Sequence, residues 1–350
     1  MGFRTKSETF GWIGDKEILL ISIYNQKGHK VSITNFGGIL HQWECLDKYG
    51  KTSDILLGCK DFADYQSTHP YFGAIIGRYA NRIAFGKFYL KGVLYTLNTN
   101  QPPHHLHGGN SGFDKKIWDA ELEEYADRCT LHLKTLSPHM EEGFPGNLMV
   151  KVSYTFNNDN ELIIDYIAST DAPTMINLTN HCYFNLTGNQ HGNILDHQVC
   201  IVADQFTEVD ETLIPTGKIL PVEGTILDLR KFRKIGDCIN AQDPMFSDTK
   251  GFDHNYVIND HNPASTVATV RDHKSGRMLE VKTDQPGMQL YTGNWLGDVD
   301  GKEGKYIPYA GLCLETQHFP DSPNHVNFPS TVLLPGEKFM SKTIYKISLF

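Results

Sequence analysis

The chain has 350 residues, of which 40% are hydrophobic, and a formal net charge of -9. Its length permits one large β domain or two smaller domains, either of which can bury a core without a disulfide or a metal. The negative charge argues against nucleic acid or an anionic membrane as a partner and favours neutral or cationic small molecules.

The seven cysteines are scattered along the chain, and no two of them form a CxxC pair. An odd number without that spacing argues against a disulfide framework and a zinc knuckle, so we expect reduced thiols in a cytoplasmic protein. The first twenty residues carry charges throughout and contain no apolar stretch that suits a signal peptide or a membrane span.

Periodic segments are short and are separated by turn residues. In chain order, they predict a helical piece at 61–66, a hairpin at 88–97 turning at Lys91-Gly92, and a helical piece at 229–234. A further hairpin is expected at 265–283, where a polar Lys-Ser-Gly turn interrupts two alternating runs.

The clearest local signal lies at residues 147–169. Apolar residues alternate with mostly polar ones from Leu148 to Phe156, an NNDN turn follows, and the same alternation resumes at Leu162. A period of two is typical of half-buried strands, so this segment predicts an antiparallel hairpin.

Many short strands and few helices predict an all-β protein. Because the chain is long, we expect an unusually large antiparallel β-sandwich. Neither a low-complexity linker nor an internal repeat divides the sequence, which favours a single domain over residues 1–350.

Several common signatures are absent. The P-loop pattern GxxxxGK[ST] and the dinucleotide pattern GxGxxG do not occur. GGNSG at 108–112 is not the GxSxG of a nucleophile elbow, and DVDGKEG at 298–304 lacks the ligand spacing of a calcium loop and predicts a solvated turn.

The segment PPHHLHGG places His105 and His107 two residues apart, on one side of any extended strand. Such a pair can be half of a metal site, but no acidic ligand follows within a few residues. A polar pair in a loop and a hydrogen-bonding role toward a substrate are the alternatives.

Two further segments combine polar residues with aromatic ones, around His181 and around Glu315. If the first is extended, His181 and Tyr183 share a face. Glu315 follows the apolar run 312–314, so we expect it at the end of a buried strand, with a raised pKa that makes it a better base at neutral pH. A salt-bridged carboxylate at the surface is the alternative.

Arg82 beside Asn81 offers hydrogen-bond donors, and Asp253 offers an acceptor. Such residues, interleaved with aromatic ones, are what a site for a polyhydroxylated ring requires, although each alone could stabilise the fold.

Taken together and in their order, these segments resemble the aldose 1-epimerase, or galactose mutarotase, family. The matching stretches are NFGGIL at Asn35, GRYANRIAFGKF at Gly77, HHLHGGNSGFDKKIWD at His104, NLTNHCYFNLTG at Asn177, TEVDETLIPTGKI at Thr207, GFDHNYVI at Gly251, GMQLYTGNWL at Gly287 and LETQHFPDSPNH at Leu314. They extend past Asn324, so the resemblance covers nearly the whole chain.

The resemblance implies a mutarotase-like supersandwich with an open cleft that interconverts the anomers of a neutral hexose such as galactose or glucose. It implies neither a metal nor a nucleotide cofactor. We expect a monomer or a weak homodimer. Glu315 would be the general base and His181 the general acid. The residues implied to bind the sugar are Asn81, Arg82, His107, Tyr183, Asp253 and Gln289; His105 is left without a role.

In that mechanism, Glu315 removes the proton of the anomeric hydroxyl while His181 protonates the ring oxygen, and the ring opens to the aldehyde. Rotation about the C1–C2 bond and reversal of the two transfers give the other anomer. Three alternatives are a sugar-binding module without turnover, a glycoside hydrolase or lyase that uses Asp253 and Glu315, and a relative acting on hexose phosphates.

Overall fold

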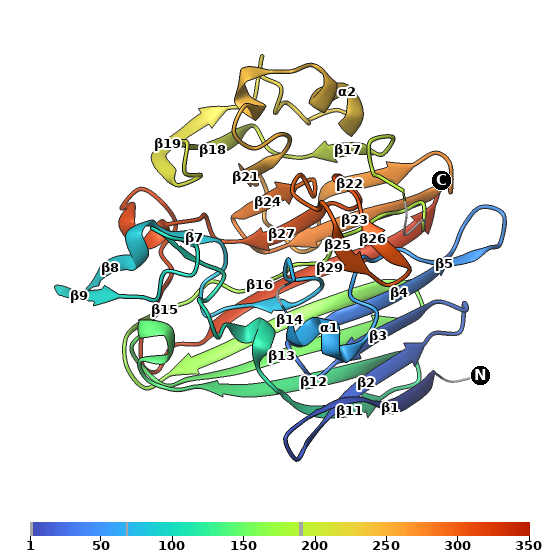
Figure 1. Cartoon of the computed structure of the whole chain (residues 1–350), viewed down its shortest axis with the longest axis horizontal. Helices are drawn as coiled ribbons and strands as arrows, with labels where there is room; N and C mark the ends of the chain where they lie inside the picture. Colours follow the sequence, from blue (N-terminus) through green and yellow to red (C-terminus); the bar gives the residue numbers. More distant parts are fainter. Residues whose placement is uncertain (1–2, 68, 189–191) are drawn as a thin grey trace.

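A computed structural model describes residues 3–67, 69–188 and 192–350, and antiparallel strands dominate it (Figure 1). The largest sheet has nine strands. In spatial order they are β11 (Asp119–Glu124), β12 (Arg128–Ser137), β13 (Leu148–Asn157), β14 (Glu161–Thr170), β29 (Phe339–Leu349), β23 (Arg277–Thr283), β22 (Thr266–Asp272), β17 (Gln198–Ile201) and β20 (Arg233–Lys234).

Two five-stranded sheets accompany the large sheet. The first consists of β1 (Arg4–Ile13), β2 (Lys16–Tyr24), β3 (Lys30–Thr34), β4 (Leu40–Leu46) and β5 (Thr52–Asp54). The second consists, in spatial order, of β19 (Pro215–Pro221), β18 (Gln205–Val209), β21 (Asp253–Val257), β24 (Gly287–Tyr291) and β27 (Cys313–Gln317).

Short paired strands and short helices fill the connections. The pairs are β6 (Ile75–Ile76) with β16 (Thr179–Asn180), β7 (Arg82–Ile83) with β10 (His105–Leu106), β8 (Lys87–Leu90) with β9 (Val93–Thr96), β15 (Thr174–Met175) with β28 (Val332–Leu333), and β25 (Val299–Gly301) with β26 (Gly304–Tyr306). The α-helices are α1 (Phe62–Gln66) and α2 (Ile235–Asn240), and the 3-10 helices are η1 (Ala84–Gly86), η2 (Phe113–Lys115), η3 (Glu141–Gly143), η4 (Pro244–Phe246) and η5 (Ser322–Asn324). Within the described ranges, no helix combines the length and the apolar character that a membrane span requires.

The core lies between the large sheet and the two smaller ones. Trp43 of β4 packs edge-to-face on Phe156 of β13, with ring centroids 6.1 Å apart. On the same face of the large sheet, the Tyr345 hydroxyl of β29 donates a hydrogen bond to the Leu314 carbonyl of β27 at 3.0 Å. These four residues belong to one cluster of buried side chains. Both five-stranded sheets therefore pack against the large sheet.

The three expected hairpins are confirmed. β13 pairs with β14 from Leu148 opposite Thr170 to Phe156 opposite Leu162, as the alternation at 147–169 predicts. β8 pairs with β9, and β22 pairs with β23. The helical piece expected at 61–66 is α1.

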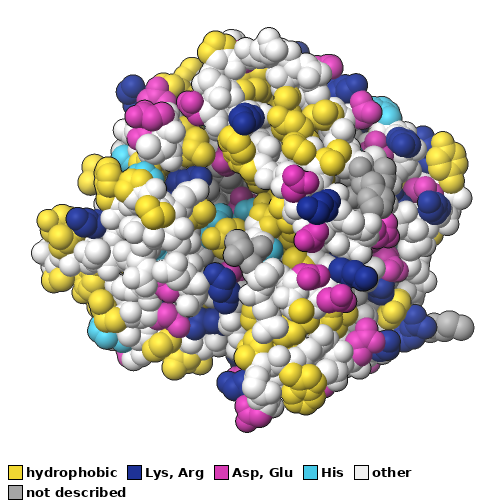
Figure 2. All heavy atoms as spheres, in the orientation of Figure 1, with side chains coloured by type: hydrophobic (Ala, Val, Ile, Leu, Met, Phe, Trp, Pro, Cys, Tyr) yellow, Lys and Arg dark blue, Asp and Glu magenta, His cyan; other side chains and the backbone are white. Residues whose placement is uncertain are grey.

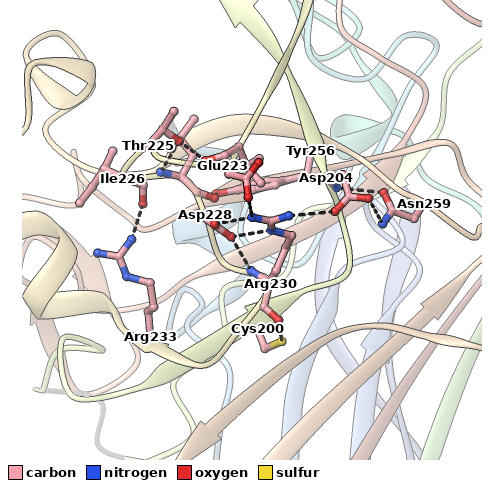
Figure 3. A network of polar contacts seen from close by, with 12 residues as sticks. Cys200, Asp204, Glu223, Thr225, Ile226, Asp228, Arg230, Arg233, Tyr256 and Asn259 are labelled. Carbon is pink, nitrogen blue, oxygen red and sulfur yellow. Dashed lines mark hydrogen bonds and ion pairs between the residues drawn. The ribbon is translucent and has the colours of Figure 1, made fainter.

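The helical piece expected at 229–234 is wrong, because this segment is a bend followed by the two-residue strand β20, and the helix α2 begins only at Ile235. The Leu229 carbonyl accepts the Ile201 N–H at 2.8 Å, and Arg233 pairs with Val199, so sheet pairing takes up the backbone groups that a helix would use. Figure 3 shows that the Arg230 guanidinium hydrogen-bonds to Asp228 and to Asp204. These bonds, of 2.8 Å and 3.5 Å, stabilise the conformation of the segment.

The solvated turn expected at 298–304 is also only partly right. β25 and β26 make it a hairpin, and the Lys302 side chain turns inward, where it is 11% exposed. Its ammonium lies 2.6 Å from Asp54 and donates to the Leu56 carbonyl at 3.1 Å. The lysine is therefore a structural tie between this hairpin and the chain that follows β5.

Candidate active site

Three neighbouring strands of the second five-stranded sheet carry the acidic part of the site. Gln289 of β24 lies opposite Glu315 of β27, and Asp253 of β21 lies opposite Tyr291 of β24. The Gln289 amide donates to Asp253 Oδ1 at 2.6 Å. Because residues two apart on a strand share a face, Cys313 lies beside Glu315.

Glu315 lies in the middle of β27, so the expected position at a strand end is wrong. The strand continues through Thr316 and Gln317, which are buried as well, because the sheet is covered on both faces at this point. The Glu315 side chain is 2% exposed, and its Oε2 has no hydrogen-bond partner among the described residues. Burial raises the pKa of Glu315 well above its ordinary value; Asp253 adds to this effect and Arg82 opposes it.

His181 follows β16 and lies against the turn before β6. Its N–H donates to the Ala74 carbonyl and its carbonyl accepts the Gly73 N–H, both at 2.9 Å. The imidazole Nε2 lies 3.6 Å from Glu315 Oε1, and Nδ1 lies 3.5 Å from the Cys313 sulfur. Burial lowers the pKa of His181 from 6.5 to about 4, so the ring is neutral near pH 7.

Tyr183 lies beside His181, with ring centroids 5.0 Å apart, which confirms that the two residues share a face. The Tyr183 ring also packs edge-to-face on Phe72 and on Tyr291. Its phenol is 2% exposed, so the side chain forms a rigid wall beside the acid–base pair.

The structure separates His105 from His107. β10 ends at Leu106, and His107 has a positive φ of 51°, so the two rings do not share a side as an extended strand would require. The His105 Nδ1 lies 2.7 Å from the Asn98 carbonyl, and the ring packs on Phe144. His105 is therefore a buried structural residue, and the pair does not form half of a metal site.

His107 instead lies with His181 and Glu315. Its ring lies edge-to-face on the ring of His181, with centroids 5.1 Å apart. Its Nδ1 accepts the Asn81 N–H at 3.2 Å, so in the neutral imidazole Nε2 carries the proton and is a hydrogen-bond donor. Burial lowers the pKa of His107 well below its ordinary value and keeps the ring neutral.

His107, His181 and Glu315 each offer an atom that could bind a metal, and these atoms lie within 4.8 Å of one another. Two imidazoles and a carboxylate are a common zinc ligand set. A metal-binding imidazole, however, needs an unprotonated nitrogen toward the metal and usually donates its other N–H to an acceptor. His107 has the opposite arrangement, so the group fits a hydroxylated ligand better than a cation.

Arg82 begins β7, which pairs with β10 and so brings the guanidinium to the same cleft. Its Nε donates to Gln101 Oε1 at 2.9 Å, and its N–H donates to Asn81 Oδ1 at 2.9 Å. Asn81 adopts a positive φ of 63°, a conformation that asparagine tolerates better than most residues.

Seven of the eight predicted ligand and acid–base residues line one cavity of about 450 Å³, and the eighth, Gln289, bonds to Asp253 at its wall. Figure 2 shows histidine side chains at the floor of a hollow near the middle of this face. The described residues that line the cavity are Pro70, Tyr71, Asn81, Arg82, Gln101, Leu106, His107, His181, Tyr183, Leu213, Asp253, Tyr291, Trp295 and Glu315.

Sequence reasoning missed several of these residues, among them Tyr71, Gln101 and Trp295. Tyr71 stands in an HPYFG segment shortly before the matching stretch at Gly77, and Trp295 stands inside the stretch at Gly287, so proximity to these stretches was the available signal. A larger groove, of about 850 Å³, lies beside β4 and β5, but none of the described residues that line it is a histidine.

Comparison with known proteins extends these observations. The description of the aldose 1-epimerase family matches residues 19–346. Galactose mutarotase from Mus musculus is 46% identical over 321 residues, and that from Homo sapiens is 44% identical over 322 residues, each alignment covering 91% of both chains. Aldose 1-epimerase from Escherichia coli (strain K12) is 36% identical and covers 93% of this chain and 94% of its own.

Solved structures agree with the sequence matches. Galactose 1-epimerase from Lactobacillus acidophilus superposes with a TM-score of 0.89 at 28% identity and covers 99% of both chains. An aldose epimerase homologue from C. elegans gives a TM-score of 0.86 at 31% identity, covering 94% of this chain and 98% of its own. The expected all-β, mutarotase-like sandwich is thereby confirmed.

Proposed function

The chain belongs to the aldose 1-epimerase family and interconverts the anomers of aldoses, and we propose that its substrates are free hexoses such as galactose and glucose, with Glu315 as general base and His181 as general acid. The observation that carries this assignment of roles is the 3.6 Å separation of Glu315 Oε1 from His181 Nε2 inside the buried cleft. A base and an acid this close can reach the two oxygens attached to one anomeric carbon.

The reaction proceeds by two proton transfers. Glu315 takes the proton of the anomeric hydroxyl, the bond between the anomeric carbon and the ring oxygen breaks, and His181 gives a proton to that oxygen. The product is the open-chain aldehyde. Rotation about the C1–C2 bond presents the other carbonyl face, and the reverse transfers close the opposite anomer.

Burial disfavours both the Glu315 carboxylate and the His181 imidazolium, so the pair rests with its proton on Glu315. Ring opening starts after this proton has moved to His181. With one proton shared by the two groups, the pair has no net charge before or after ring opening. The proton can therefore move between Glu315 and His181 without leaving a net charge in a site from which water is largely removed.

The remaining polar groups suit a neutral polyhydroxylated ring. The His107 Nε2–H and the Arg82 guanidinium are donors that hold the ring-oxygen side and stabilise charge that develops there. Asp253, fixed by the Gln289 amide, is an acceptor for sugar hydroxyls, Asn81 offers both donor and acceptor groups, and the Tyr183 ring forms the wall.

The charge of the cleft favours a free hexose over a hexose phosphate. Arg82 is the single lysine or arginine among the described residues that line the cavity, whereas Asp253 and Glu315 also line it. A phosphate group would require more positive charge to replace its hydration.

The same proposal includes a single catalytic domain that acts in the cytoplasm as a monomer or weak homodimer. All of the side chains named for the site come from one chain, so catalysis needs no partner subunit. All seven cysteines are free thiols, and six of them are buried, which suits a reducing compartment.

Polarimetry of freshly dissolved α-D-galactose and α-D-glucose tests the proposal. We expect the wild-type protein to accelerate the change in optical rotation over the spontaneous rate. Glu315→Gln, which keeps the shape of the side chain but removes the base, should lower kcat by at least 10³-fold, whereas the exposed control Glu121→Gln should match the wild type. A Glu315→Gln variant that still turned over at the wild-type rate would exclude Glu315 as the base.

Saturable sugar binding with no acceleration by the wild type would instead indicate a binding module. Release of reducing sugar from a glycoside would indicate hydrolysis with Asp253 and Glu315 as the carboxylates. Each outcome identifies a different activity at the same cleft.

A further inference from the structure

The turn at residues 71–74 holds the backbone of His181. The Gly73 N–H donates to the His181 carbonyl, and the Ala74 carbonyl accepts the His181 N–H. The same turn is closed by the Ala74 N–H, which donates to the Tyr71 carbonyl at 3.1 Å. Tyr71 is therefore the first residue of the turn whose backbone bonds to His181.

Tyr71 adopts a positive φ of 59°. A bulky side chain is rarely found in the left-handed region, because its Cβ crowds the following carbonyl. Residues that keep such a conformation are held by their surroundings, and they are concentrated at functional sites. At this position, the conformation directs the Tyr71 ring into the cleft, where it lines the cavity.

The Tyr71 ring contacts both imidazoles of the site. Its centroid lies 4.7 Å from that of His107 at an interplanar angle of 62°, and 5.8 Å from that of His181 at 33°. The two imidazoles are themselves 5.1 Å apart at 82°. Three mutually packed rings leave neither imidazole room to rotate without displacing another ring.

The hydroxyl of Tyr71 connects this cluster to the loop that carries His107. It accepts the Asn100 amide at 3.5 Å, and the same amide donates to the carbonyls of Leu106 and Gly109. The Asn100 oxygen accepts the Leu106 N–H at 2.8 Å. Asn100 thus spans the residues on either side of His107, with Tyr71 packed above them.

From these contacts we propose that Tyr71 is a positioning residue of the anomer exchange: its ring holds His107 and His181 in their reactive orientations and keeps water from both imidazoles. Tyr71 moves no proton itself, and the role rests on the function proposed for Glu315 and His181. Since the 3.5 Å hydrogen bond is long, the ring carries most of the effect and the hydroxyl carries little.

Removal of the ring should also change how His181 titrates, because water would enter beside the imidazole and stabilise its charged form. The other titratable and charged groups that contact His181 or line the same cavity remain in place in such a variant; they are His69, Arg82, His107, Tyr183, Asp253, Tyr291, Cys313 and Glu315. A change in the titration of His181 therefore reports the loss of the ring.

The test compares Tyr71→Leu, Tyr71→Phe and the control Phe62→Leu, which removes a buried ring of α1 that packs on Phe36 and does not line the cavity. For Tyr71→Leu, we expect kcat to fall at least tenfold with KM changed less than threefold, and the pKa of His181, followed by proton NMR of its ring, to rise by about one unit. Tyr71→Phe should stay within threefold of the wild type.

A Tyr71→Leu variant with the wild-type kcat and an unchanged His181 titration would overturn the proposal, and so would equal effects in Phe62→Leu. If the wild type shows no anomer exchange, the proposed function fails. The NMR titration then still shows whether the Tyr71 ring keeps water from His181, because it needs no turnover.

Discussion

His181 has its two ring nitrogens in different surroundings, with a thiol at Nδ1 and a carboxyl group at Nε2. Neither neighbour compensates for the loss of water around a charged ring, and burial lowers the pKa of the imidazole to about 4. Glu315 is shifted in the opposite direction by the same cause. Near neutral pH the two groups therefore hold one proton between them, and we expect this form to be the active one.

The pH dependence of turnover follows from this pair. Activity should fall as the pH drops through about 4, where His181 becomes charged while Glu315 keeps its proton, and not near the 6.5 of an exposed histidine. At the alkaline end, activity should persist until Glu315 ionises, above the ordinary range of a carboxyl group. Initial rates of α-D-galactose mutarotation between pH 3.5 and 9, corrected for the spontaneous reaction, measure the fall in activity at the acidic end (the acid limb) and at the alkaline end. An acid limb with its half-maximal rate near pH 6.5 would contradict this account.

Asp114 provides a second prediction, for stability. It is 1% exposed, its Oδ1 has no hydrogen-bond partner among the described residues, and its nearest cation, Lys115, is 3.8 Å away. Burial raises the pKa of Asp114 from 3.8 to about 6. Because the folded-state pKa lies above the unfolded one, the folded protein loses stability as the pH rises from 4 through 6, by about 2 to 3 kcal/mol in all.

Asp114→Asn should therefore stabilise the protein by about 2 kcal/mol at pH 8 and by much less at pH 4.5. Urea unfolding of both proteins at the two pH values measures the difference. An asparagine variant that is less stable at pH 8 would show that the carboxylate has a stabilising partner.

The residue scale also shows where sequence reasoning reaches its limit. The raised pKa of Glu315 could be anticipated from the apolar run before it, but its place in mid-strand could not, because buried polar residues continue the strand without an apolar signal. The packing of the Tyr71 ring on two imidazoles depends on the positive φ of this residue, which cannot be predicted from a tyrosine in the sequence.

At the scale of elements, length separates what could be predicted from what could not. The hairpins β13–β14 and β22–β23 have enough residues to show a period of two. β6, β7, β10 and β16 have two residues each, which carry no periodicity, yet β7 and β10 bring Arg82 and His107 to the cleft. The site is thus assembled by the elements that are least visible in the sequence.

The loop after β10 makes a testable case. Gly108 has a φ of 91°, and a Cβ there would lie 1.8 Å from the Gly77 carbonyl oxygen, a backbone atom that cannot move aside easily. Gly108→Ala should cost at least about 3 kcal/mol and displace the neighbouring His107, lowering kcat. Gly92→Ala is the matched control, since Gly92 also has a positive φ, of 80°, but nothing lies within 4 Å of the added carbon.

For that control, the expected cost is about 1 kcal/mol with no loss of activity, because only backbone strain opposes the side chain. Urea unfolding and polarimetry of the two variants separate strain from steric conflict. Equal losses in both would mean that the loop around Gly108 can relax.

For the whole molecule, composition and strand density predicted a large sandwich. The packing of two five-stranded sheets against the nine-stranded sheet agrees with that prediction. The order of strands within the nine-stranded sheet could not be predicted, because it depends on pairings between distant segments. β29, the last strand of the chain, lies between β14 and β23, and Tyr345 lies opposite both Leu162 and Val281.

This central position leads to a prediction about cooperativity. Because β29 pairs with β14 of the strands at residues 119–170 and with β23 of those at residues 198–283, unfolding of either part leaves one edge of β29 unpaired. We expect one calorimetric transition whose van't Hoff and calorimetric enthalpies agree, as a single domain requires. A chain that ends at Lys338, and so lacks β29, should fail to fold, whereas one that lacks only Phe350 should unfold close to the wild-type temperature. Two resolved transitions in the full chain, or a folded product from the shorter one, would show that the halves are independent.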